Sequence, residues 1–133
     1  QGLENIPDAR KIREEVFISE QGFINEFDDI DDYAYHIVIY KDGVAAATGR
    51  LFPKDNDVYI IGRVAVLKAY RKQRLGELIV KNLEEKAKEL GAAQVQLSAQ
   101  VQAKGFYEKL CYISVGEEYL DEGCPHILML KDL

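Results

Sequence analysis

One stretch, residues 57–91, constrains the fold of this chain more than any other. It opens with β-branched and aromatic residues over Asp57–Leu67, which predict a strand, and closes with a helical pattern over Leu75–Leu90 that Gly91 should end. Gly62, inside the strand, suggests a bulge or a close approach by another backbone. Between strand and helix lie four cations and no acid, namely Lys68, Arg71, Lys72 and Arg74. Because the free N–H groups of a helix start also favour anions, this turn is a candidate phosphate site.

The helix after the turn is expected to be amphipathic. Its apolar residues recur at the spacing of one helical face: Leu75, Leu78, Ile79, Leu83, Ala87 and Leu90. The other face carries charges in the favourable i,i+4 order, Glu77 with Lys81 and Glu84 with Lys88. This helix should therefore lie on a sheet with its charged face in water.

Length and composition limit the class of protein. A chain of 133 residues predicts a single domain over residues 1–133, and 47% hydrophobic residues suffice for one core. The net charge of −6 disfavours a nucleic-acid or anionic-membrane partner. The two cysteines, Cys111 and Cys124, lack metal-ligand spacing, so we expect no metal and a reducing cytoplasm. No apolar run is long enough to span a membrane.

The remaining segments predict helices and strands in mixed order. Besides the unit above, they are a helix from Ile6 to about Ser19–Gly22, strands over Tyr35–Tyr40 and Val44–Phe52 joined by an Asp42-Gly43 turn, a strand over Gln94–Ala99, a helix over Val101–Leu110, and strands over Tyr112–Tyr119 and His126–Leu130. Strands 57–67 and 94–99 should be parallel with a right-handed crossover. The fold class is α/β (a mixed α+β sheet), with helices flanking a central mixed sheet. The chain begins at Gln1 rather than Met, which is compatible with a further strand before it.

An acidic segment, Glu26–Asp32, follows the first helix and holds five acids in seven residues. It does not fit a calcium loop, because counting from Asp28 places Tyr33 at the glycine position and Ile39 at the final glutamate position. A solvent-exposed loop is the favoured interpretation.

Two short motifs give the chain a resemblance to a known family. The basic turn reads R-K-Q-R-L-G over Arg71–Gly76, and a later helix carries F-Y-E-K-L over Phe106–Leu110. They resemble the pyrophosphate loop, [RQ]-x-x-G-x-[GA], and the F-Y-x-[KR]-x-G-F segment of the GNAT superfamily of acetyl-CoA-dependent N-acetyltransferases. Arg74 replaces the middle glycine of the first motif, and Cys111-Tyr112 replaces Gly-Phe in the second.

Longer matches narrow the resemblance to the ElaA-like branch of that family. They are R-E-E-V-F-I-S-E-Q-G from Arg13, G-R-V-A-V-L-K from Gly62, L-S-A-Q from Leu97 and G-C-P-H-I-L-M from Gly123. These matches are spread from Arg13 to Met129, in the order that the family has. The resemblance implies the GNAT fold and acetyl transfer to an amine.

The resemblance also implies a binding site for acetyl-CoA without any metal. The pyrophosphate would be held by the loop Arg71, Lys72, Gln73, Arg74, Leu75 and Gly76, and the pantetheine arm by the strand edge at Val64, Ala65 and Val66. In the family a bulge splays the central parallel strands, and Gly62 fits such a bulge. Arg74 could obstruct the loop with its Cβ or contact phosphate with its charge, and we favour the contact. Gln100 could also face this cleft, although a hydrogen bond at the sheet edge would explain it equally well.

Acid–base roles follow from the chemistry of the reaction. Tyr107 stands at the family's general-acid position, where it would protonate the leaving thiolate. The attacking amine must lose a proton, and the candidate bases are Glu20, His36 and His126. A histidine in such a place is often only a hydrogen-bonded part of the fold, so the choice of base stays open.

The sequence leaves two classes of function. One is an N-acetyltransferase acting on a primary amine of a small molecule or peptide, and the other is a non-catalytic acyl-CoA-binding module. In the GNAT fold the segment from Glu20 to Asp32 borders the acceptor end of the cleft, so the resemblance favours a small cationic amine. These acids would be explained equally well if they only solubilise a loop. The oligomeric state stays open, with a homodimer as one option.

Overall fold

The computed structural model describes residues 2, 6–21, 27–121 and 123–133. Gly22, Glu26 and Glu122, which entered the sequence expectations, lie outside these ranges. The described elements follow one another along the chain as α1 Pro7–Arg13, a π-helix η2 Glu14–Glu20, the 3-10 turn η3 Asp29–Asp32, β1 Tyr35–Lys41, β2 Val44–Pro53, β3 Val58–Val66, the 3-10 turn η4 Lys68–Tyr70, α2 Leu75–Glu89, β4 Gln94–Gln100, the 3-10 turn η5 Val101–Ala103, α3 Lys104–Lys109, β5 Ile113–Asp121 and β6 Cys124–Asp132.

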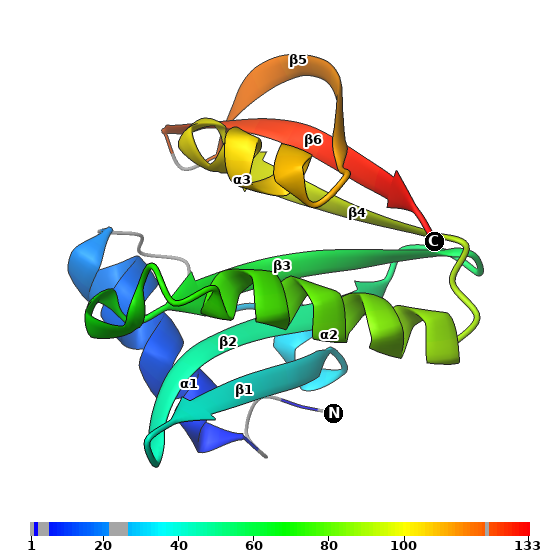
Figure 1. Cartoon of the computed structure of the whole chain (residues 1–133). Coiled ribbons are helices and arrows are strands. Elements are labelled where there is room, and N and C mark those ends of the chain that lie inside the picture. Colours follow the sequence, from blue (N-terminus) through cyan, green and yellow to red (C-terminus); the bar gives the residue numbers. More distant parts are fainter. Residues whose placement is uncertain (1, 3–5, 22–26, 122) are drawn as a thin grey trace.

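The strands form a single mixed sheet in the order β1-β2-β3-β4-β6-β5 (Figure 1). β1, β2 and β3 are an antiparallel meander, β3 and β4 are parallel, and β6 lies antiparallel between β4 and β5. The first turn, Asp42-Gly43, has positive φ at both residues, as the type I′ turn of a two-residue hairpin requires. The predicted fold class and the parallel pair are confirmed.

The two central strands separate soon after they pair. β3 and β4 are in register only from Val58–Gln94 to Ile60–Gln96, and Figure 1 shows them diverging beyond that point. The cause lies in β3, where Arg63 and Val64 together oppose Gly49 of β2 and so form a bulge. Arg63 adopts φ +50°, a left-handed conformation that non-glycine residues seldom take. The sequence suggested a bulge at Gly62. The bulge begins one residue later, at Arg63.

The helices bury the two faces of the sheet. On one face α2 contributes Leu75, Ile79, Val80, Leu83 and Ala87 to the main core, together with residues from five strands. On the other face Ile12, Val16 and Phe17 of the first helix pack on Ala65. α2 approaches closely because Gly49 has no side chain; a Cβ there would lie 2.7 Å from Ile79 Cγ2.

Two predictions about α2 are wrong in detail. Leu78 is exposed rather than part of the apolar face, because Val80 takes its place in the core. Glu84 does not pair with Lys88: it is buried and accepts hydrogen bonds from the Tyr112 hydroxyl at 2.6 Å and from Lys131 Nζ at 3.1 Å. The expected Glu77–Lys81 pair is present at 2.9 Å.

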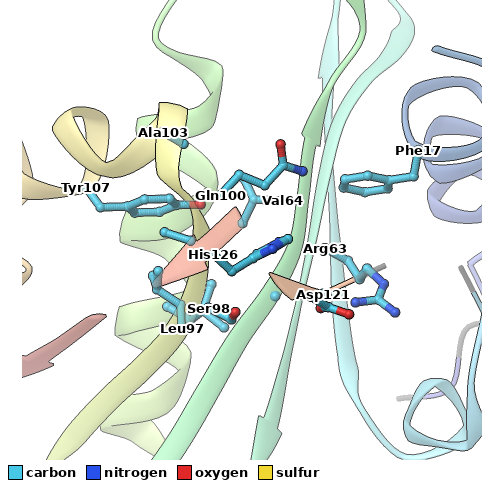
Figure 2. Close-up of a pocket in the computed structure, with 13 residues that line it drawn as sticks. Phe17, Arg63, Val64, Leu97, Ser98, Gln100, Ala103, Tyr107, Asp121 and His126 are labelled. Carbon is cyan, nitrogen blue, oxygen red and sulfur yellow. The ribbon is translucent and has the colours of Figure 1, made fainter. Parts of the chain in front are cut away.

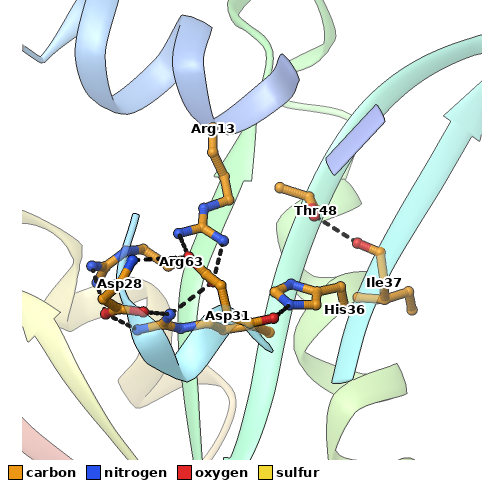
Figure 3. Close-up of polar contacts among 8 residues, drawn as sticks. Arg13, Asp28, Asp31, His36, Ile37, Thr48 and Arg63 are labelled. Atoms are coloured by element: carbon orange, nitrogen blue, oxygen red, sulfur yellow. Dashed lines mark hydrogen bonds and ion pairs between the residues drawn. The ribbon is translucent and has the colours of Figure 1, made fainter. Parts of the chain in front are cut away.

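The acidic segment is not simply a solvated loop. Asp31 is 4% exposed and receives both Nη atoms of Arg13, at 2.6 and 3.1 Å (Figure 3). Arg50 binds Asp31 at 2.9 Å and Asp28 at 2.7 and 3.1 Å. We call Arg13, Asp28, Asp31 and Arg50 the arginine–aspartate cluster; it joins the first helix and the acidic segment to β2. Asp29 and Asp32, which the same prediction covered, are exposed.

Candidate active site

A cavity of about 430 Å³ opens where β3 and β4 diverge (Figure 2). Its walls come from the bulge of β3, the end of β4, α3 and the β5–β6 hairpin, and include Phe17, Gly62, Arg63, Val64, Ser98, Gln100, Ala103, Tyr107, Asp121 and His126. Most of its polar lining comes from β4, β5 and β6, so this cavity can hold a polar reactant beside the splayed strands.

A second cavity of about 560 Å³ lies under the basic loop. It is lined by the β3 edge Val64, Ala65 and Val66, by loop residues Arg71, Lys72, Arg74, Leu75 and Gly76, and by Val16, Tyr70, Glu77, Ala103, Phe106 and Tyr107. The apolar β3 edge thus continues into a cationic loop at the start of α2. Such a cavity suits an elongated molecule with an apolar arm and an anionic end.

The two cavities meet at a shared wall. Val64, Ala103 and Tyr107 line both of them. Val64 follows the strained bulge residue Arg63, and Tyr107 comes from the short helix α3 that follows β4. The bulge and α3 therefore bring the ends of the two cavities together at the Tyr107 ring.

The basic loop keeps a left-handed turn without the expected glycine. Arg74, the N-cap of α2, has φ 62° and ψ 22°, and Lys72 also has positive φ. At the end of the motif Gly76 packs closely on Phe106: a Cβ there would lie 3.3 Å from Phe106 Cζ, so that ring would have to shift slightly. The loop thus holds two cationic residues in the left-handed region, which strains the backbone there.

Arg71 has a different environment from the rest of the loop. Its Nη atoms bind both carboxylate oxygens of Glu20 at 2.6 and 2.7 Å, and its Nε donates to the Val66 carbonyl at 3.0 Å. These bonds and the positive charge hold the pKa of Glu20 below its usual value. Arg71 therefore joins the end of the first helix to the end of β3, and its charge is partly neutralised.

Tyr107 keeps its proton at neutral pH. Burial raises the pKa of its hydroxyl to about 12. The ring is fixed by edge-on contacts with Phe106 and Tyr112, at centroid distances of 4.9 and 5.8 Å. A protonated phenol at the junction of two cavities is suited to donate a proton.

The three candidate bases lie in different places. His126 lines the first cavity, whereas Glu20 and His36 do not occur among the described lining residues of either cavity. Glu20 is held by Arg71, and His36 lies on β1 with its Nε2 3.2 Å from the Asp31 carbonyl, beside the arginine–aspartate cluster. Burial lowers the pKa of His36.

The remaining expected cofactor residues also have defined positions. Gln100 lines the first cavity and donates to Gln21 Oε1 at 3.0 Å, which bridges the ends of β4 and the first helix. Gln73 belongs to the basic loop but is not among the described residues that line the second cavity. Among the residues described, no group of three or more His, Cys, Asp or Glu side chains could hold a metal ion, and no described helix is long and apolar enough to cross a membrane.

Sequence reasoning missed several lining residues, namely Phe17, Arg63, Ser98, Ala103 and Asp121. Only Arg63 had a local signal, as the neighbour of an isolated strand glycine. The others reach the cavity through the pairing of strands and the packing of helices, which single residue types do not reveal.

Comparison with known proteins agrees with this geometry. A family model described as an acetyltransferase (GNAT) domain matches residues 6–133. The chain belongs to the GNAT acetyltransferase family. Within that family it falls in the ElaA-like branch: the ElaA protein of Escherichia coli is 33% identical over 129 residues, which cover 92% of this chain and 84% of ElaA.

Other relatives place the chain firmly among GNAT proteins. The Bacillus subtilis N-acetyltransferase YjcF, whose own name calls it uncharacterized, is 39% identical over 132 residues, covering 97% of this chain and 94% of YjcF. The crystal structure of an acyl-CoA N-acyltransferase from Pseudomonas aeruginosa has a TM-score of 0.86 at 30% identity, covering 98% of this chain and 92% of that one. The crystal structure of Escherichia coli ElaA has a TM-score of 0.87 at 27% identity, with the same coverages.

Proposed function

We infer that this GNAT protein transfers the acetyl group of acetyl-CoA to a primary amine of a small molecule or peptide. The observation that carries this proposal is the meeting of two cavities at Tyr107. One cavity is apolar with a cationic end, and the other is polar and lies beside the splayed strands. A donor and an acceptor could each occupy one cavity and bring their reacting atoms together beside the same phenol.

The second cavity fits acetyl-CoA in its donors and its shape. Lys72, Arg74 and the backbone N–H groups at the start of α2 would hold the pyrophosphate. The β3 edge at Val64, Ala65 and Val66 would accompany the pantetheine arm, because the ladder with β4 ends at Ile60 and leaves that side of β3 unpaired with β4. Arg71 contributes less directly, since Glu20 binds its guanidinium.

The catalytic role proposed for Tyr107 rests on its place where the two cavities meet. As the amine nitrogen bonds to the acetyl carbon and the carbon–sulfur bond breaks, negative charge develops on sulfur. Tyr107 would donate its proton there, which yields the free thiol of CoA. The proposed mechanism is direct attack of the amine, without an acetylated residue of the protein.

Binding of acetyl-CoA should stabilise the fold measurably. At about 100 times its dissociation constant, a ligand that binds only the native state adds about 2.7 kcal/mol to the free energy of unfolding. Thermal unfolding with saturating acetyl-CoA or CoA should therefore show a higher Tm than the protein alone. The absence of a shift with either ligand would contradict the proposed binding site.

A panel of amines tests catalysis separately from binding. Wild-type protein, acetyl-CoA and each amine are combined, and free thiol release is followed over time. Thiol release that depends on an amine supports the transferase. A Tm shift without thiol release from a broad panel would favour the other class of function, a non-catalytic acyl-CoA-binding module.

Arg74→Gly should weaken CoA binding while it stabilises the apo protein. Glycine adopts the left-handed conformation of Arg74 without strain, so apo Tm should rise. Loss of a charge-assisted bond to phosphate should raise the CoA dissociation constant about tenfold and reduce its salt dependence. Calorimetric titration at two salt concentrations measures both, with Arg74→Lys as the control that keeps charge and strain. Tighter binding by Arg74→Gly would show that the side chain obstructs the loop.

The amine panel also measures which charge the acceptor carries. The acidic segment was expected to attract a cation, but Asp28 and Asp31 are bound by arginines of the cluster, and Glu26 lies outside the described residues. The first cavity itself carries both signs, with Arg63 and Asp121 among its lining residues. The panel should therefore include amines with and without an anionic group.

A further inference from the structure

His126 has a defined tautomer in this structure. Its Nδ1 lies 2.7 Å from the backbone carbonyl oxygen of Cys124, two residues earlier on β6. Because a carbonyl oxygen can only accept, Nδ1 must carry the hydrogen. The other ring nitrogen, Nε2, is then the basic atom of the neutral imidazole.

The ring of His126 is held at the wall of the first cavity. In the sheet His126 pairs with Gln100 on β4 and with Tyr119 on β5. It is 7% exposed, and its ring stacks on Tyr119 with centroids 6.2 Å apart and planes at 24°. The Tyr119 hydroxyl is hydrogen-bonded to Ser98 Oγ, which ties that ring to β4. Figure 2 shows the imidazole among the lining residues between β3 and β4.

The second histidine has the opposite arrangement. His36 uses Nε2 toward the Asp31 carbonyl, so its basic atom is Nδ1. That atom is buried and has no hydrogen-bond partner in the part of the chain that the structure describes. His36 also does not occur among the described lining residues of either cavity. Of the two imidazoles in the sequence, His126 alone lines the cavity that would hold the acceptor.

We propose that His126 is the general base of the transfer, with the Cys124 carbonyl and Tyr119 as the groups that position its ring. This assignment rests on the proposed acetyltransferase function. His126 Nε2 takes one proton from the acceptor ammonium, directly or through water, and later releases it to solvent. The amine then bonds to the acetyl carbon and the carbon–sulfur bond breaks. Tyr107 donates its proton to the sulfur and becomes a phenolate. The nitrogen of the new amide loses its second proton to this phenolate, which restores the phenol.

The pH dependence follows from this role. Only the neutral imidazole can accept a proton, so kcat/KM should fall at low pH. Among the described residues, the titratable or charged groups that line the first cavity with His126 are Arg63 on β3, Tyr107 on α3 and Asp121 on β5. Tyr119 stacks on the His126 ring, and the Cys124 backbone carbonyl accepts its hydrogen bond. Protonation of His126 would produce the acidic limb of the pH profile.

Comparison of His126→Gln with His36→Gln tests the assignment. With the best amine of the panel, His126→Gln should lower kcat/KM about 10²–10⁴-fold and abolish the acidic limb, leaving a rate that rises with the fraction of neutral amine. The loss should shrink for acceptors whose amine is already neutral at the assay pH. His36→Gln should keep the acidic limb, whatever its effect on stability.

Three outcomes separate the hypotheses. If wild type releases no thiol with any amine, the proposed function fails before the base is tested. If wild type is active and His126→Gln keeps both its rate and its acidic limb, His126 is not the base. Retention of the limb by His126→Gln together with its loss in His36→Gln would also overturn the assignment.

A chemical measurement covers the case in which His126→Gln does not fold. In His36→Gln the only imidazole left is that of His126, so carbethoxylation of this variant modifies a single histidine. Modification should abolish turnover, and hydroxylamine should restore it. Full activity after complete modification would contradict the proposal.

Discussion

Tyr107→Phe is expected to lower kcat about 10²–10⁴-fold while the affinity for acetyl-CoA stays nearly unchanged, because general-acid assistance is worth roughly that factor. The substitution removes one hydroxyl and keeps the ring that contacts Phe106 and Tyr112. Single-turnover measurements give the rate of the chemical step, and calorimetric titration gives the affinity. An unchanged rate with a good acceptor would assign Tyr107 to the fold alone.

Tyr112→Phe is the matched control for that experiment. Tyr112 lies beside Tyr107, but its hydroxyl donates to buried Glu84 rather than facing the cavities. Its loss should reduce stability and leave kcat close to that of wild type. In wild type, the raised pKa of Tyr107, about 12, keeps the phenol protonated, so no alkaline limb from this group should appear below about pH 11.

The fold was predictable where its signals are local. The unit from Asp57 to Gly91 has strand composition, a basic turn and helical periodicity within a short stretch, and the structure shows β3, the loop and α2 there. The basic loop and Tyr107 could also be predicted from the sequence, because each belongs to a short motif. Their neighbours in the cavities could not be predicted from the sequence. Ser98 and Asp121 line the first cavity because the strand order β4-β6-β5 places them beside it.

Errors arose where a polar residue is buried by a distant partner. Asp31 resembles its exposed neighbours in sequence, but Arg13 and Arg50 lie 18 and 19 residues away along the chain. Glu84 has a helical neighbour at the right spacing, yet its hydrogen-bond donor Tyr112 is 28 residues away. A single sequence contains no local sign of such pairs, and burial of a charge depends on them.

The departures from the family motifs have a structural explanation. Cys111, at the usual glycine position, has φ +73°, a left-handed conformation that glycine adopts without strain. Tyr112, at the usual phenylalanine position, adds the hydroxyl that binds Glu84. Neither residue lines a cavity among those described, so the departures give no support to a loss of catalysis.

Asp31→Asn is expected to lower the free energy of unfolding at neutral pH by about 3–5 kcal/mol, because removing one partner of a buried ion pair leaves the other charge uncompensated. Arg13 is 1% exposed and Arg50 is 3% exposed, and both bind Asp31 Oδ1. Urea unfolding at equilibrium measures the change. Asp29→Asn and Asp32→Asn, in exposed positions of the same segment, should each change stability by no more than about 0.5 kcal/mol.

The effect of Asp31→Asn should depend on pH in a defined direction. Burial alone would raise the pKa of Asp31, but the hydrogen bonds and charge of Arg13, with help from Arg50, outweigh it and lower the pKa from 3.8 to about 2. A carboxyl with a lowered native pKa stabilises the fold fully above its unfolded pKa and loses that contribution as pH falls through its native pKa. The stability gap between wild type and Asp31→Asn should thus narrow between about pH 4 and pH 2, by about 2 kcal/mol. A gap that stays constant over this range would show that the charge of Asp31 does not stabilise the cluster.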